Sequence, residues 1–307
     1  MIISASRRTD IPALYSKWFL NRLEAGFVMV PNPRVPNRLG RVELSPNNVD
    51  CIIFWTKNPA PMLDKLAQIE AMGYAFYFQF TLTPYGNTIE RNLPQKTELI
   101  SIFKELGQRF GSERLVWRYD PILLDATHSI HWHYEQFYEL SEKVHPYTRR
   151  CILSFIDPYK HITGRFQEVR REEMIAVASG FSKIAEKYGL VLFACAEETY
   201  LTECGVGRSS CIDQELIEKI LGCGIRARKD VAQRPACACI ESVDIGVYDT
   251  CINECAYCYA TTSPKTALRR FENHAPDAPM LTGYPVGGEI VTDRTTKSQK
   301  TNQLRLF

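Results

Sequence analysis

Short apolar segments alternate with longer helical patterns along the first two thirds of this chain. Helical patterns span Pro61–Met72, Lys96–Phe110 and Glu172–Tyr188. The apolar segments are rich in Val, Ile, Phe, Tyr and Trp, as buried parallel strands are. They span Ile2–Ala5, Cys51–Trp55, Ala75–Leu82, Leu115–Tyr119, Cys151–Ile156 and Leu190–Ala196. Repeated strand and helix units with right-handed crossovers predict an α/β fold whose parallel sheet is partly or fully closed into a (β/α) barrel.

Three cysteines near the C-terminus, Cys251, Cys255 and Cys258, have the spacing C-x3-C-x2-C. Three thiolates this close in sequence suit three irons of a 4Fe–4S cluster. The fourth iron then lacks a protein ligand, and an open coordination position on a metal centre is where chemistry occurs. The alternative is a structural zinc knuckle, although zinc sites prefer paired C-x2-C units.

This spacing, with an aromatic residue before the last cysteine, resembles the radical S-adenosylmethionine (SAM) superfamily. The wider string Asp244-Ile-Gly-Val-Tyr-Asp-Thr-Cys251 is most similar to the spore photoproduct lyase group, and to an uncharacterised bacterial family within it that carries the motif near the C-terminus. The resemblance implies that the open iron binds SAM, and that an electron from the cluster cleaves SAM to a 5′-deoxyadenosyl radical.

The position of the motif departs from the usual superfamily order. In most radical SAM proteins the first strand leads into the cysteine loop, whereas here a candidate strand at Ser242–Val247 precedes that loop near the C-terminus. The resemblance therefore implies a circular permutation, in which the C-terminal strand lies beside the N-terminal one. Permutation is tolerated when the original termini are close together.

Polar residues follow the predicted strands. Chemistry collects at the carboxyl ends of the strands in a parallel barrel. The candidate SAM-binding residues at these ends are Arg7, Lys57, Arg118, Asp120, Glu197 and Glu198. Arg118 would bind the SAM carboxylate through charge-assisted hydrogen bonds, and Glu197 or Glu198 would face its amino group or ribose hydroxyls. The alternative for each residue is an ordinary helix cap or turn position.

The residues that would return a hydrogen atom to a substrate radical are Cys195, Tyr257 and Tyr259, chosen because they lie near the motif. In such an enzyme the cofactor supplies the radical, and the protein supplies positioning and a dry cavity.

A second group of cysteines precedes the motif, at Cys211, Cys223, Cys237 and Cys239. Cys237 and Cys239 are separated by one residue, and we expect them to bind one metal together, as part of a second Fe–S cluster or a zinc site. Their partners would come from Cys195, Cys211 and Cys223. A helix expected over Asp213–Leu221 would separate Cys211 from Cys223 by roughly 18 Å unless the flanking loops fold back. The alternative is that these thiols are buried small hydrophobic groups.

Composition limits the class of protein. The chain has 307 residues, of which 45% are hydrophobic, enough for one large core. The formal charge of +2 does not by itself indicate a nucleic acid partner. No apolar run reaches the length of a membrane span, and no signal peptide is recognisable. Eleven cysteines, one cluster of them closely spaced, predict a cytoplasmic metalloprotein rather than a disulfide scaffold.

The tail ends in Gln303-Leu-Arg-Leu-Phe307, after a polar segment at Arg294–Thr301 that is expected to be mobile. Gln-Leu-x-Leu-Phe resembles the peptide with which bacterial repair and replication proteins bind the DNA polymerase sliding clamp. The alternative is that these side chains pack on their own domain. Between Tyr259 and Phe307 seven bases oppose four acids, a mild excess that would help contact with phosphates.

These features predict a barrel over residues 1–200, a cysteine-rich region with the closing strand and cluster loop over 201–263, and a C-terminal extension over 264–307. The leading hypothesis is a radical SAM enzyme, served by a reducing electron donor, that repairs or modifies a DNA lesion. A damaged base in a duplex would have to be turned out of the stack to be reached. The alternatives are a radical SAM enzyme acting on a peptide or small metabolite, and a non-catalytic zinc- or Fe–S-stabilised nucleic acid adaptor.

Overall fold

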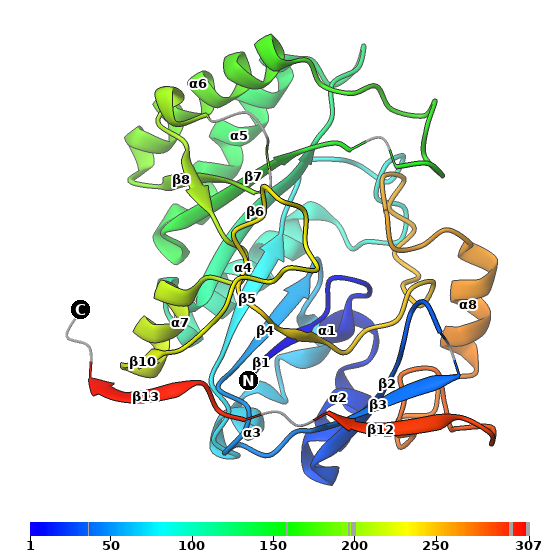
Figure 1. Cartoon of the computed structure of the whole chain (residues 1–307). Helices are drawn as coiled ribbons and strands as arrows, with labels where there is room; N and C mark the ends of the chain where they lie inside the picture. The colour runs from blue at the N-terminus through cyan, green and yellow to red at the C-terminus, as the bar shows by residue number, and fades with distance from the viewer. Residues whose placement is uncertain (36, 158, 196, 198–200, 295–296, 305–307) are drawn as a thin grey trace.

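A computed structural model describes residues 1–35, 37–157, 159–195, 197, 201–294 and 297–304. Its centre is a sheet of eight parallel strands in the order β11-β1-β4-β5-β6-β7-β8-β9 (Figure 1). The strands are β1 (Ile2–Ala5), β4 (Cys51–Thr56), β5 (Phe76–Thr81), β6 (Leu115–Ile122), β7 (Arg150–Phe155), β8 (Val191–Cys195), β9 (Gly207–Ser209) and β11 (Val243–Asp244).

The sheet confirms the predicted α/β class, and each of the six apolar segments forms a strand. The short strand β11 pairs in parallel with β1, with Val243 opposite Ile3 and Asp244 opposite Ser4. The C-terminal strand therefore lies beside the N-terminal one, as expected. Among the described residues the pairings run from β11 to β9 without joining these two outer strands.

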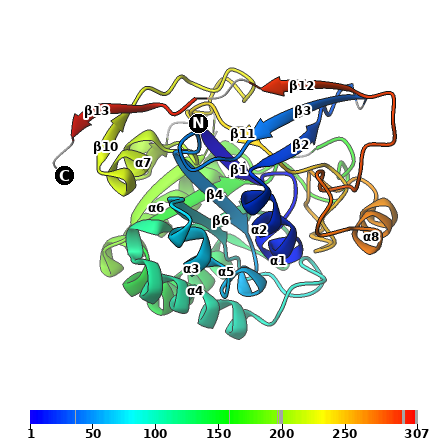
Figure 2. The same ribbon diagram turned by 90° about the horizontal axis from the view of Figure 1, so that it is seen from below.

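In the described part of the chain, six helices pack on one face of the sheet (Figure 2). They are α1 (Ile11–Leu14), α2 (Ser16–Ala25), α3 (Leu66–Ala71), α4 (Lys96–Phe110), α5 (Ile130–Val144) and α6 (Arg171–Tyr188). Short 3₁₀ helices span Ala60–Met62, Ser112–Arg114, His145–Tyr147 and Thr202–Cys204. In α4 the side chains of Leu99, Phe103 and Leu106 recur at helical spacing and are buried, and the helix ends at Gly111, where φ is 84°.

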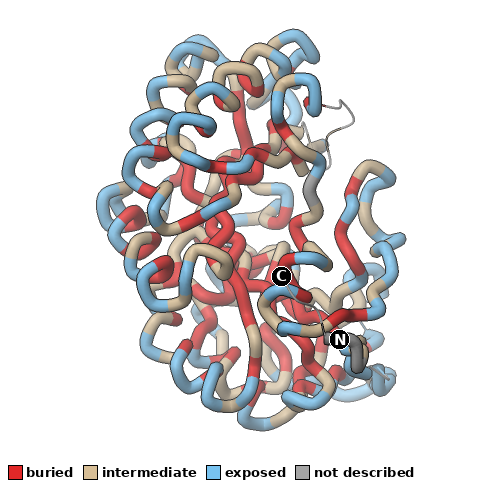
Figure 3. The backbone as a smooth tube through the Cα atoms, turned by 90° about the vertical axis from the view of Figure 1, so that its left-hand side faces the viewer, coloured by how far each residue is buried: buried red, intermediate tan, exposed pale blue. Residues whose placement is uncertain are grey.

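Side chains alternate between the two faces of each strand. On β4 and β5, Phe54, Phe76 and Phe78 pack in the large core beneath the helices. Their sequence neighbours, such as Ile53 and Tyr77, point to the opposite face and belong to a smaller core. Burial is continuous along the central strands, which therefore read as unbroken apolar runs in the sequence (Figure 3).

The smaller core is covered by α7 (Gln214–Leu221), β10 (Cys223–Ile225) and the loop that leads to β11 (Figure 2). The predicted helix after Cys211 is confirmed: Asp213 caps its first turn by accepting a hydrogen bond from Leu216 N, and Gly222 ends it in the left-handed conformation. Toward the carboxyl ends of the strands this second face becomes polar, and there it carries Trp55, Gln79 and Arg118.

The remaining strands among the described residues form two small sheets. One joins β2 (Phe27–Pro31), β3 (Arg38–Glu43) and β12 (Ile290–Arg294), and the other joins β10 to β13 (Lys300–Leu304). Helix α8 (Pro264–Glu272) follows the cysteine loop. The described part of the polar tail segment is paired rather than free, because β12 and β13 are strands. In addition, the buried carboxylate of Asp50 accepts hydrogen bonds from Ser298 Oγ at 2.5 Å and Gln299 N at 2.8 Å.

Within the described ranges, every helix is too short or too polar to cross a lipid bilayer.

Candidate active site

The loop that carries Cys251, Cys255 and Cys258 follows β11 at the carboxyl edge of the sheet. Asp244, the last residue of β11, fixes its start. The Asp244 carboxylate accepts hydrogen bonds from Ser6 Oγ at 2.6 Å, Arg7 N at 2.9 Å and Gly246 N at 3.0 Å. Gly246 is required at its position, since a Cβ there would lie 2.0 Å from Ser6 Oγ. The cysteine loop is therefore tied directly to the end of β1.

Distant segments hold the rest of the loop. Tyr15 donates its hydroxyl to the Thr250 carbonyl at 2.6 Å, and Asn92 donates its amide to the Ile252 carbonyl at 2.7 Å. His161 contacts the Cys258 carbonyl at 2.7 Å. Glu254 has a positive φ of 50°, which is uncommon for a residue other than glycine. The loop is a fixed part of the molecule rather than a loose connection.

The three thiols of the motif are half-buried and interact electrostatically with one another. Burial, and secondarily the charge of Cys258, raises the pKa of Cys251 to about 12. Burial also raises the pKa of Cys255 well above its usual range, against an opposing effect of Lys57. These thiols would have to lose protons to bind iron, so their affinity for metal depends on pH. As the described side chains stand, no three or more His, Cys, Asp or Glu residues are gathered around one metal position.

A buried carboxylate that the sequence did not reveal lies beside Cys255. Glu90 accepts hydrogen bonds at 2.8 Å from both Lys57 Nζ and Thr83 Oγ1, and it also contacts Lys96 Nζ and the Tyr257 hydroxyl. Burial acts to raise the pKa of Glu90, but the two lysines outweigh it and hold that pKa at about 2. Glu90 belongs to no periodic pattern or motif, so only the fold identifies it.

Lys57, a predicted SAM-binding residue, therefore lies next to the motif. Burial acts to lower the pKa of the Lys57 amine, but Glu90 and then Cys255 oppose it and the pKa is raised. The amine also lies 5.2 Å from the centre of the Tyr257 ring. A fixed positive charge beside Cys255 would stabilise a thiolate there.

The polar face of the sheet forms a second part of the site. Arg118 lies 5.2 Å and Arg7 lies 5.1 Å from the centre of the Trp55 ring. Arg118 donates hydrogen bonds to Asp120 Oδ2 at 3.1 Å and to Gln79 Oε1 at 3.4 Å. Among the described residues, Arg7 Nη2 and Trp55 Nε1 are buried without a hydrogen-bond partner. Buried unpaired donors are costly, so this pair marks a place where a ligand acceptor would be stabilising.

Glu197, which follows β8 in sequence, accepts a hydrogen bond from Phe155 N at 2.9 Å. Burial, with the charges of Asp157 and Asp120, raises the pKa of Glu197 to about 7 despite that hydrogen bond. A carboxyl group whose pKa is raised by burial and neighbouring charges is typical of functional sites. Glu198, the other predicted acid at this strand end, lies outside the described residues.

The predicted hydrogen-atom donors occupy different surroundings. Tyr257 is buried with its hydroxyl on Glu90, and Tyr259 is partly exposed and donates to the Arg7 carbonyl at 2.5 Å. Cys195 lies at the end of β8, where its sulfur is 2.8 Å from Cys211 Sγ. Cys195 therefore belongs to the second cysteine group rather than to the motif.

That second group is assembled in part as expected. Cys211, Cys237 and Cys239 are buried together in the smaller core, whereas Cys223 is half-buried in β10, where it pairs with Leu304 of β13.

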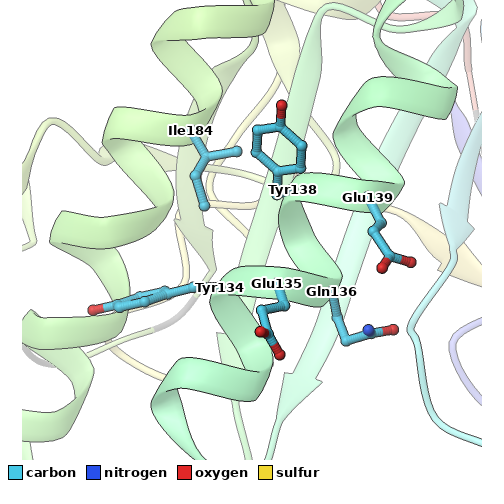
Figure 4. Close-up of a pocket in the computed structure, with 6 residues that line it drawn as sticks. All are labelled: Tyr134, Glu135, Gln136, Tyr138, Glu139 and Ile184. Atoms are coloured by element: carbon cyan, nitrogen blue, oxygen red, sulfur yellow. The ribbon is translucent and has the colours of Figure 1, made fainter.

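A shallow depression on the outer surface lies between α5 and α6, away from these strand ends (Figure 4). It is lined by Tyr134, Glu135, Gln136, Tyr138, Glu139 and Ile184. None of these residues adjoins the cysteines or the polar face, so the depression is not part of the candidate site.

A model of a domain of unknown function, DUF1848, matches residues 2–260 of the chain. The search among curated proteins gave no match. Among solved structures, a protein from Bacteroides thetaiotaomicron described as a candidate alpha-L-fucosidase is 12% identical, with 75% of this chain and 85% of that chain covered. Its TM-score is 0.26, and a similarity of this size indicates neither a shared fold nor a shared activity.

Proposed function

The chain belongs to the DUF1848 family, and we propose that it is a radical SAM enzyme whose cluster loop has been moved to the C-terminal end of a permuted (β/α) barrel. The observation that carries the proposal is the pairing of β11 with β1. Through that pairing, C-x3-C-x2-C lies at the carboxyl edge of a parallel sheet, next to the chain's first strand. This position supports the proposal, because a permuted barrel would bring the motif beside the first strand despite its place in sequence.

The residues of the loop suit the cofactor. Cys251, Cys255 and Cys258 would hold a 4Fe–4S cluster, since their thiols lie in one fixed loop and influence one another's charge. When bound, the cluster would supply the electron, drawn from a reducing donor, that cleaves SAM to methionine and a 5′-deoxyadenosyl radical. Lys57 would stabilise the Cys255 thiolate, and Glu90 would keep that lysine charged and in place.

The polar face suits the zwitterionic part of SAM. The unpaired Arg7 Nη2 and Trp55 Nε1 donors would bind its carboxylate. Arg118 already bonds Asp120 and Gln79, so its role would be to position Trp55 and the neighbouring acids rather than to bind the carboxylate alone. Glu197 would accept from the amino group or ribose hydroxyls in its ionised form.

The cofactor assignment is tested by iron, sulfide and electron paramagnetic resonance (EPR) measurements on anaerobically reconstituted protein. We expect about four irons in the loop cluster and a reduced-cluster signal that changes when SAM is added. The Cys255→Ala variant should lose the iron and the EPR signal, whereas the control Cys204→Ser should keep the iron and the signal. A wild-type EPR signal that SAM does not alter would exclude SAM binding to the cluster.

The substrate class rests on the sequence resemblance. We propose a lesion in nucleic acid, because the motif is most similar to the spore photoproduct lyase group and the tail resembles a sliding-clamp peptide. Residues 305–307 of that peptide lie outside the described residues, and residues 300–304 form β13. Clamp binding through the whole peptide would therefore require β13 to separate from β10. Otherwise the clamp could contact only the residues that follow β13.

A binding assay with purified clamp tests this partner. The full chain should bind, and a chain that lacks residues 303–307 should not. If neither binds, the radical SAM assignment stands and the substrate is better sought among peptides and small metabolites. If SAM is not cleaved but nucleic acid is bound, the chain is a non-catalytic adaptor.

A further inference from the structure

Four cysteines of the second group, Cys195, Cys211, Cys237 and Cys239, gather in or against the smaller core. Cys195 Sγ lies 2.8 Å from Cys211 Sγ, and Cys237 and Cys239 belong to the same small core as Cys211. Cys211, Cys237 and Cys239 are buried, and Cys195 is half-buried. The chain brings them from three places, namely the end of β8, the loop before α7 and the loop between β10 and β11.

The surroundings of the cluster differ from those of ordinary buried cysteines. Arg118 Nη1 donates to Cys211 Sγ at 2.8 Å, and the Arg7 guanidinium interacts electrostatically with Cys211 and Cys239. A cysteine that merely fills apolar space gains nothing from a guanidinium. Thiolate ligands of a metal are instead stabilised by nearby cations and by donors aimed at sulfur.

The backbone around the cluster is also fixed in advance. Ile212 N donates to Cys239 Sγ at 3.4 Å, and Ile240 N donates to the Ile212 carbonyl at 3.2 Å, which joins two cysteine segments to each other. The Cys211 carbonyl accepts from Tyr77 at 2.8 Å and from Gln79 at 2.7 Å. These contacts hold the ligand segments in the way that outer-shell hydrogen bonds support metal sites.

The spacing favours a single ion. A tetrahedral zinc ion with Zn–S bonds of about 2.3 Å holds its four sulfurs roughly 3.8 Å apart. A 4Fe–4S cluster binds each thiolate to a different iron and keeps the sulfurs farther apart. The Cys195 and Cys211 sulfurs already lie 2.8 Å apart. In their described positions the four thiols do not surround one metal position, so to bind an ion they would have to lose their protons and rotate toward a common centre.

We propose that Cys195, Cys211, Cys237 and Cys239 bind one zinc ion, which joins β8 to the loops that cover the second face of the sheet. The proposal does not rest on the proposed function, since it uses none of the cysteines of C-x3-C-x2-C. Its role is to fix the segments that carry Cys211 and Cys239 beside Arg7 and Arg118 on the polar face.

The test uses the full chain with Cys251, Cys255 and Cys258 replaced by alanine, which removes the other thiol cluster. After anaerobic purification with Zn²⁺ we expect about one zinc per chain, and with Co²⁺ the absorption bands of tetrahedral thiolate coordination. Adding Cys237→Ser and Cys239→Ser should abolish both, whereas adding Cys223→Ser should change neither.

Three results would overturn the proposal. The first is the absence of zinc and of cobalt–thiolate bands from the protein that retains all four cysteines, and this readout does not require the serine variants to fold. The second is a Cys195–Cys211 disulfide, found by mass spectrometry in the anaerobic protein. The third is iron and sulfide, in place of zinc, that disappear with Cys237 and Cys239, because they would identify a second cluster.

Discussion

Replacing Glu90 with glutamine tests whether the buried network beside Cys255 is held by charge. The side chain of Glu90 is 1% exposed, while its partners Lys57 and Lys96 are 14% and 25% exposed. Its pKa is displaced from an ordinary 4.5 to about 2, which corresponds to about 3 kcal/mol of folding free energy at neutral pH. Glu90→Gln leaves both lysines without their counterion. We therefore expect it to lower the free energy of unfolding by about this amount.

The assay is urea unfolding of wild type, Glu90→Gln and the control Glu105→Gln at several pH values. Glu105 forms an exposed ion pair with Arg109 at 3.0 Å, so its substitution should cost under about 0.5 kcal/mol. A carboxyl group whose pKa is depressed on folding stabilises the protein above its unfolded pKa. The advantage of wild type over Glu90→Gln should therefore be complete at pH 7, shrink below about pH 4.5 and vanish near pH 2. Equal stability of wild type and Glu90→Gln at pH 7 would refute the electrostatic account.

Three further substitutions follow from the site. Trp55→Phe should keep an aromatic ring against the arginines and leave the iron content unchanged. Because one hydrogen-bond donor is lost, it should weaken SAM binding about tenfold, as measured by equilibrium dialysis. An unchanged affinity for SAM would show that Trp55 is not part of the site. Gly246→Ala should destabilise the loop and lower iron retention, whereas Gly86→Ala, with open space around it, should do neither. The pKa of Glu197 is raised to about 7, so its protonated form contributes fully to stability below about pH 4.5, and this contribution is lost as the pH rises through 7. Glu197→Gln should therefore flatten the dependence of the urea midpoint on pH between these values. Identical profiles for wild type and Glu197→Gln would refute the raised pKa.

The main sheet was predictable because its strands are local apolar runs. Phe76, Phe78 and Phe80 face one core while Tyr77 faces the other, so burial on both sides leaves a continuous signal in the sequence. The predicted helix at Lys96–Phe110 has the observed bounds for a similar reason, since its apolar face recurs at helical spacing and a glycine follows it.

The small sheets were not predictable. Strand β12 is exposed along its whole length and pairs with β3, which is about 250 residues away in sequence, so no local pattern marks it. Likewise the polar tail carries the composition of a free segment, yet Asp50 and β10 hold its described part. Such contacts depend on which distant surfaces the fold brings together.

The candidate site likewise contains residues that the sequence identified and residues that only the fold reveals. The motif cysteines were identified by spacing, and Arg7, Lys57 and Arg118 by their position at or just beyond the carboxyl ends of strands. Glu90 was missed because a single acid in a loop has no signature until two lysines are seen to surround it. The grouping of Cys195 with Cys211, rather than with the motif, likewise depends on the pairing of β8 with β9.

The most direct test of the central claim is to incubate anaerobically reconstituted protein with SAM and dithionite and to measure 5′-deoxyadenosine. Wild type should form it, and variants with alanine at Cys251, Cys255 or Cys258 should not, while the variant with serine at Cys204 should match wild type. Protein that holds zinc at these cysteines and forms no 5′-deoxyadenosine would contradict the account.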